Sequence, residues 1–177
     1  MTGPTPGQGS SDTAGAGPQG AYVYRVEAVS SAPVDVVRPL LGRASRWREW
    51  SFLTRSELER DGAPDPDGVG AVRRFSAYGV GSREEVVAWD PPHHLAYRIL
   101  SGFPVRNYRS DVTLEPAGTG TRIEWAGSFD PQVPGTGRLI EAVLAQLMRK
   151  FVRDVTRFAN DLPSGPSTDP RPAAPGR

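Results

Sequence analysis

Two hydrophobic periods alternate along this chain, and together they predict an antiparallel sheet packed on one long helix. Between residues 22 and 29, apolar and polar side chains alternate, which is typical of a strand with one buried face. The same period of two recurs in six later segments, separated by short turns rich in Gly, Pro and Asp. Links of hairpin length make neighbouring strands antiparallel. The later strands are expected at residues 54–60, 70–78, 83–89, 95–100, 108–115 and 121–129.

Helical periodicity appears in three places. Pro33 and Gly42 bracket a short helix predicted over residues 34–41, and a second short helix is expected over 44–50. The longest helical pattern covers residues 138–160, with an apolar stripe at spacings of three and four. That stripe consists of Leu139, Ile140, Val143, Leu144, Leu147, Met148, Phe151, Val155 and Phe158. The order of elements predicts an α+β helix-grip fold. In this fold a curved antiparallel β-sheet of about seven strands wraps around a long C-terminal α-helix, with two short helices after the first strand.

Gly and Pro concentrate at both ends of the chain. Residues 1–20 contain nine of them, and residues 161–177 contain seven. Segments of this composition bury too little apolar surface to offset the entropy lost on ordering. We therefore expect disordered tails over residues 1–20 and 162–177, and one domain over residues 21–161.

Composition then narrows the function classes. The 177 residues carry a formal net charge of +1, from 21 basic and 20 acidic side chains, so we expect no nucleic-acid partner. The chain has no cysteine, and its two histidines, His93 and His94, are adjacent in one turn, so we expect neither a metal nor a cofactor. No apolar run approaches the ~20 residues of a membrane span. The N-terminus lacks the pattern of a signal peptide, and a cytoplasmic protein is expected.

Two ionisable residues on inward strand faces are candidate site residues. If Phe75 faces the core, alternation places Arg73 on the same face. A buried arginine needs an acceptor, which is either a ligand oxygen or an acid such as Glu84. Glu84 itself lies on a face that continues through Val86. Burial would raise the pKa of its carboxyl and suit it to proton transfer, while an ion pair with Arg73 or Arg98 is the alternative.

Two residues with hydroxyl groups are further candidates for the site. Tyr108 and Ser110 alternate with charged residues on a core-facing row, where they need partners from a ligand, from water or, for Tyr108, from a backbone carbonyl. Met148 and Phe151 of the long helix are expected to close the floor of a cavity between the helix and the sheet. The expected catalytic residues are Arg73, Glu84 and Tyr108. The expected ligand-binding residues are Phe75, Ala77, Val86, Arg98, Ser110, Val112, Trp125, Met148 and Phe151.

Five segments, taken in order, resemble the START/polyketide cyclase (SRPBCC) superfamily. They are residues 31–37, 68–73, 84–91, 95–99 and 108–114, and the resemblance covers residues 22–160. It implies a START-like ligand-binding domain with a small-molecule cavity between sheet and helix.

The resemblance also implies roles for individual residues. In the polyketide cyclases, an arginine on the third strand polarises a substrate oxygen, and Arg73 is the matching position. The plant hormone receptors of the superfamily have a pocket strand similar to residues 107–110, which implies that Tyr108 and Ser110 line the ligand. Glu84 falls where those receptors place a pocket glutamate. The chain departs from them at Thr54, where their pocket lysine falls.

Enzyme and carrier both remain open from the sequence. The first hypothesis is a cavity for a hydrophobic, polyketide-like or lipid-like molecule, with cofactor-independent cyclisation or dehydration of the lyase or isomerase type. Arg73 would then stabilise developing negative charge, and Glu84 or Tyr108 would move protons. The alternatives are a non-catalytic carrier or sensor of such a ligand, and a protein-interaction module. The sequence leaves monomer and homodimer equally open.

Overall fold

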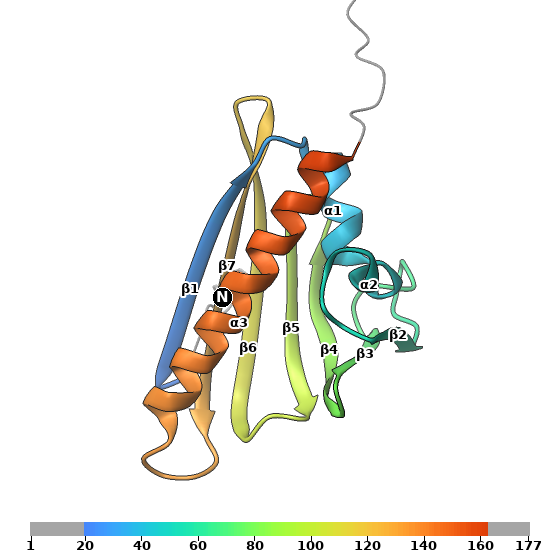
Figure 1. Cartoon of the computed structure of the whole chain (residues 1–177). Helices are drawn as coiled ribbons and strands as arrows, with labels where there is room; N and C mark the ends of the chain where they lie inside the picture. Colours follow the sequence, from blue (N-terminus) through green and yellow to red (C-terminus); the bar gives the residue numbers. More distant parts are fainter. Residues whose placement is uncertain (1–19, 163–177) are drawn as a thin grey trace, which may run out of the picture.

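The computed structural model describes residues 20–162, so the predicted tails lie outside it except for their innermost residues, Gly20 and Leu162. Seven strands form one antiparallel sheet in the order β1-β7-β6-β5-β4-β3-β2, and the predicted fold class is confirmed. Figure 1 shows the sheet curving behind one long helix that crosses its inner face. The strands are β1 (Tyr22–Ser30), β2 (Arg55–Arg60), β3 (Val72–Ala77), β4 (Val80–Asp90), β5 (His94–Ser101), β6 (Val105–Ala117) and β7 (Gly120–Pro131).

The helices are α1 (Val34–Gly42), the 3-10 helix η1 (Ala44–Arg46), α2 (Trp47–Trp50) and α3 (Gly137–Asp161). The second short helix predicted from the sequence is therefore a 3-10 turn that continues into one α-helical turn. The indole N–H groups of Trp47 and Trp50 donate to the carbonyl oxygens of Leu41 and Leu40, each at 3.0 Å. These two bonds attach η1 and α2 to the end of α1.

Aromatic and aliphatic side chains fill the space between the sheet and α3. The Trp47 ring lies 5.8 Å from the Trp125 ring and 5.4 Å from the Phe151 ring, and thereby joins α2, β7 and α3. At the far end of α3, the side-chain carbonyl of Asn160 accepts a hydrogen bond of 2.7 Å from the Ser30 hydroxyl. This contact ties the last turn of α3 to the end of β1.

The apolar stripe predicted for α3 is wider than the surface that buries it. Leu139 and Val143 are 68% and 53% exposed, whereas Leu144, Met148 and Phe151 are buried. A helix that packs on one layer buries only the middle of a broad apolar stripe, so residues at its margin remain in solvent.

A turn and a bulge, each with positive φ angles, explain why β4 and β6 begin earlier than the hydrophobic pattern predicted. The connection between the strands expected at residues 70–78 and 83–89 is a two-residue turn at Tyr78 and Gly79, with positive φ angles of 52° and 83°, and β4 begins immediately after it. A turn with two positive φ angles matches the twist of a hairpin. Strand β6 begins at Val105, three residues early, because a bulge at Asn107 with φ 52° lets pairing with β7 resume.

Candidate functional site

A cavity of about 230 Å³ lies between the inner face of the sheet and α3. Its wall is mostly apolar, and among the residues that the structure describes Glu84 is the only acidic or basic one that lines it. Eight of the lining residues are aromatic: Trp47, Phe52, Phe75, Tyr97, Phe103, Tyr108, Trp125 and Phe151. Such a wall favours an apolar, planar molecule with one polar end.

Seven of the residues expected at the site line this cavity. They come from β3, β4, β6, β7 and α3, the elements whose inward faces the sequence indicated. These residues are Phe75, Ala77, Glu84, Tyr108, Trp125, Met148 and Phe151.

Three other expected residues are buried but do not reach the cavity wall. Val86, Ser110 and Val112 have exposed fractions of 1%, 0% and 2%. Ser110 bonds to Tyr24, which lies behind the wall, and to the indole of Trp125, whose ring lines it. Val112 packs in a separate small space beside Leu41 of α1. The inward direction of their strands' faces was predicted correctly, but the cavity occupies only part of the inner face.

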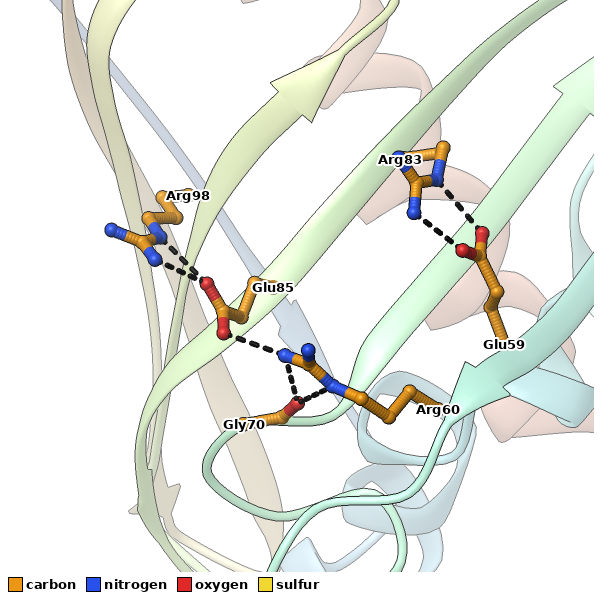
Figure 2. A network of polar contacts seen from close by, with 6 residues as sticks. All are labelled: Glu59, Arg60, Gly70, Arg83, Glu85 and Arg98. Atoms are coloured by element: carbon orange, nitrogen blue, oxygen red, sulfur yellow. Dashed lines mark hydrogen bonds and ion pairs between the residues drawn. The ribbon is translucent and has the colours of Figure 1, made fainter.

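The placement of Arg98 in the cavity was wrong. Its side chain lies on the outer face of the sheet, where Nε and Nη2 lie 2.7 Å and 2.5 Å from Glu85 Oε2 (Figure 2). Tyr97 and Ile99, on either side of it in β5, line the cavity, so strand alternation directs Arg98 outward. Glu85 also accepts from Arg60, which makes this an ionic network of the solvent face.

Arg73 lies behind the cavity wall rather than in it. Its side chain is fully buried, and it stands directly opposite Glu84 in the β3–β4 pairing. Its Nη2 atom forms an ion pair with Oε1 of Glu84. The guanidinium carbon lies 5.8, 5.5 and 5.1 Å from the ring centroids of Trp47, Phe75 and Tyr97. Within residues 20–162 its nitrogens make no well-aligned hydrogen bond, so Glu84 is its main electrostatic partner.

Burial raises the pKa of the Glu84 carboxyl, and the charge and contact of Arg73 oppose this rise. A carboxyl with a raised pKa holds a proton more readily than an exposed one, which suits it to proton transfer. Because its partner Arg73 is fully buried, this carboxyl is also the charged group that a ligand in the cavity would meet first.

A cluster of hydroxyl groups adjoins the carboxyl. The Tyr24 hydroxyl lies 2.5 Å from that of Tyr108 and 3.0 Å from that of Ser110. The Trp125 indole N–H donates to Ser110 at 2.9 Å and to the Tyr97 hydroxyl at 3.1 Å. Burial raises the pKa of Tyr24 to about 12, and it raises the pKa values of Tyr97 and Tyr108 well above their ordinary value. All three phenols are therefore neutral at physiological pH.

Twelve residues of the cavity wall, and Tyr24 of the hydroxyl cluster, were not named as site residues from the sequence. Tyr97 lines the wall. The sequence could have identified it as inward-facing, because it alternates with Leu95 and Ile99 on the inner face of β5. Tyr24 reaches the cluster from β1, and nothing local in β1 distinguishes it from a packing residue. Phe52 and Leu53 line the wall from the segment before β2, which has no periodicity to read.

Residues 20–162 contain no group of three His, Asp or Glu side chains placed to hold a metal ion. None of the helices described is long and apolar enough to cross a membrane.

Comparison with known proteins identifies the family of this chain and shows other proteins with the same fold. Residues 23–160 match the model of a family described as polyketide cyclase / dehydrase and lipid transport. None of the curated proteins matches the chain. A solved structure from Thermobifida fusca is 25% identical, with a TM-score of 0.64, and the match covers 80% of this chain and 95% of that one.

More distant structures share the architecture. A START superfamily protein from Mycobacterium smegmatis has a TM-score of 0.67 at 7% identity, covering 78% of this chain and 97% of its own. Norcoclaurine synthase from Thalictrum flavum, solved with dopamine and hydroxybenzaldehyde, has a TM-score of 0.63 at 15% identity, covering 80% and 88%. At these identities the likeness concerns the fold alone. Together with the family match, these structures confirm the resemblance to the START/SRPBCC superfamily.

Proposed function

Because this chain belongs to the polyketide cyclase / dehydrase and lipid transport family, we propose that its cavity binds a hydrophobic small molecule with a polyketide-like or lipid-like skeleton. The observation that carries this proposal is an apolar, aromatic-walled cavity to which the described residues contribute a single carboxyl group, that of Glu84. Transfer of apolar surface from water into such a wall is worth about 25 cal/mol per Å². Affinity therefore comes from the body of the ligand, and orientation comes from its polar end.

The size of the cavity limits the ligand. Its volume of about 230 Å³ lies below the ~300–1,000 Å³ usual for drug-sized ligands. A ligand of one or two rings, or a short chain folded on itself, fits this space. Aromatic walls favour the ring compound, because planar groups pack against them in offset or edge-to-face contacts.

The finer proposal is cofactor-independent cyclisation with loss of water, in which Glu84 transfers the proton. The carboxylate takes a proton from the carbon next to a ligand carbonyl, and the resulting enolate attacks a second carbonyl of the same molecule to close a ring. The proton then returns to the new alkoxide, and the hydroxyl so formed leaves with a neighbouring hydrogen as water. Arg73 does not touch the ligand in this scheme, and it stabilises the carboxylate form of Glu84 from behind.

A carrier or sensor without chemistry is the second candidate. It is favoured by the hydroxyl cluster, in which Tyr24, Tyr108 and Ser110 bond to one another rather than to the open space. Glu84→Gln separates the two candidates. An enzyme would keep ligand binding and lose turnover, whereas a carrier would show no turnover in either form.

Binding itself is testable through the two tryptophans of the wall. A ligand in contact with Trp47 and Trp125 should change their fluorescence, and mass spectrometry of molecules that co-purify with the protein supplies ligands to titrate. Ala77→Phe places a ring in the open space and should abolish the response. Arg98→Met, on the outer face, is the matched control and should leave it unchanged. Equal responses from both variants would refute the proposal.

A further inference from the structure

The hydrogen bonds of the hydroxyl cluster have determined directions, beginning at Ser110. Its hydroxyl carries one proton, and its oxygen lies 3.1 Å from the carbonyl oxygen of Ala126, which can only accept. The Trp125 indole can only donate, so Ser110 accepts from it at 2.9 Å. Ser110 therefore directs its proton to Ala126 and accepts from every other neighbour.

This direction propagates to two tyrosines. Tyr24 lies 3.0 Å from the Ser110 oxygen, and because Ser110 has no proton left, Tyr24 donates to it. Tyr24 then has no proton for Tyr108, whose hydroxyl is 2.5 Å away, so Tyr108 donates to Tyr24. Any other assignment would bring two lone pairs or two protons together in one of these contacts. The Tyr108 oxygen thus offers only a lone pair to a ligand.

Tyr97 differs from both. Its hydroxyl accepts from the Trp125 indole at 3.1 Å, and within residues 20–162 no hydrogen bond takes up its own proton. The ring lines the cavity and is only 3% exposed. Burial raises the pKa of Tyr97 well above its ordinary value, so the phenol keeps this proton; the hydroxyls of Ser110 and Tyr108 lie close enough to oppose the rise but form no hydrogen bond of good geometry with it. A buried hydroxyl proton without an acceptor is unfavourable, so a ligand acceptor would be bound there.

We propose that Tyr97 is the hydrogen-bond donor of the cavity and that it binds a ketone oxygen of the ligand. The inference rests on the proposed function and specifies its ligand class as an apolar, planar ketone. Tyr108 and Glu84 line the same wall as acceptors, so a hydroxyl near the ketone fits beside them. If the ketone becomes an enolate, the Tyr97 hydrogen bond strengthens as charge develops on its oxygen.

Two probes of equal shape test this assignment. Acetophenone carries a ketone, and in α-methylstyrene a methylene group replaces its oxygen. Tyr97→Phe should weaken acetophenone binding by about threefold to tenfold, the usual net worth of one hydrogen bond, and leave α-methylstyrene binding unchanged. Tyr22→Phe, the matched control, removes the hydroxyl of a tyrosine that packs on Phe129 outside the cavity wall and should weaken neither probe. The carbonyl stretch of bound acetophenone should be lowered in the wild type and in Tyr22→Phe but not in Tyr97→Phe.

The outcomes separate this inference from the function it rests on. If neither probe changes the fluorescence of the wild-type protein, the proposed cavity function fails and the inference fails with it. If both probes bind and Tyr97→Phe affects them equally, with the carbonyl stretch unchanged, only the inference is overturned. Should Tyr97→Phe not fold, the wild type still decides, because a bound carbonyl with the stretching frequency it has in hexane contradicts a donor at Tyr97.

Discussion

Replacement of Arg73 by methionine should lower stability far more than ligand affinity. Arg73 is fully buried, pairs with Glu84 and does not line the cavity. Methionine fills much of the same space without a charge, so the substitution removes the ion pair and leaves the cavity wall intact. The ligand would lose no direct contact, whereas Glu84 would lose the one cation that pairs with it within residues 20–162.

The size of the loss follows from this burial. Removal of one member of a buried ion pair costs about 3–5 kcal/mol, because the other charge remains uncompensated. Glu84 reduces this cost by taking up a proton, since burial already raises its pKa and the opposing effect of Arg73 would be gone. The loss should therefore be smaller at low pH. For a domain of this size it corresponds to a fall in melting temperature of about 6–20 °C.

Urea denaturation at acidic and at mildly alkaline pH measures this loss. Arg73→Met, Glu84→Gln and the double variant close a thermodynamic cycle, whose coupling energy isolates the pair. We expect the double variant to be more stable than Arg73→Met at the higher pH. An Arg73→Met protein with unchanged unfolding free energy and no ligand response would refute this reasoning, because the arginine would then act on the ligand.

Three further predictions concern the same core. Burial raises the pKa of Glu84 above 4.5, so its stabilising contribution is present below that pH and is lost as the pH rises through the raised value. The wild type should therefore lose unfolding free energy relative to Glu84→Gln over that range, and parallel pH profiles would contradict this. In thermal melts, Leu144→Ala should cost about 2–5 kcal/mol and the exposed Leu139→Ala less than about 0.5 kcal/mol; equal losses would mean that both face the core. Asn160→Ala should cost about 1–2 kcal/mol in urea melts by freeing the Ser30 hydroxyl, whereas Asn160→Asp, which keeps the acceptor, should cost less.

The strands were predictable because their pattern is local, and so was one pairing between them. The two-residue turn at Tyr78 and Gly79 places Arg73 opposite Glu84, which were named from the sequence as candidate partners. Arg98 was misplaced because it was assigned to the cavity as a possible ion-pair partner of Glu84, although strand alternation between two inward neighbours directs it outward. Its orientation could therefore have been predicted from the sequence.

The hydroxyl cluster was beyond sequence reasoning for a physical reason. It joins Tyr24 of β1 to residues of β6 through β7, so its geometry depends on the register of three strands that are distant in the chain. Gly127 opposes Tyr24 in this pairing, and a Cβ atom there would lie 2.4 Å from the Tyr24 hydroxyl oxygen. The phenol reaches Tyr108 only because that position has no side chain. Such a vacancy cannot be recognised before the strands are aligned.

The two faces of β4 also limit how this chain can change in length. Glu84 faces the cavity, and Glu85, one step further, holds the arginines of the outer network (Figure 2). A single-residue deletion within the strand would exchange them, which would place the cavity carboxyl in solvent and remove the anchor of the network. Deletions and insertions should therefore be tolerated in exposed connections such as residues 132–135, whereas a strand can change the kinds of residue that it contains but not how many.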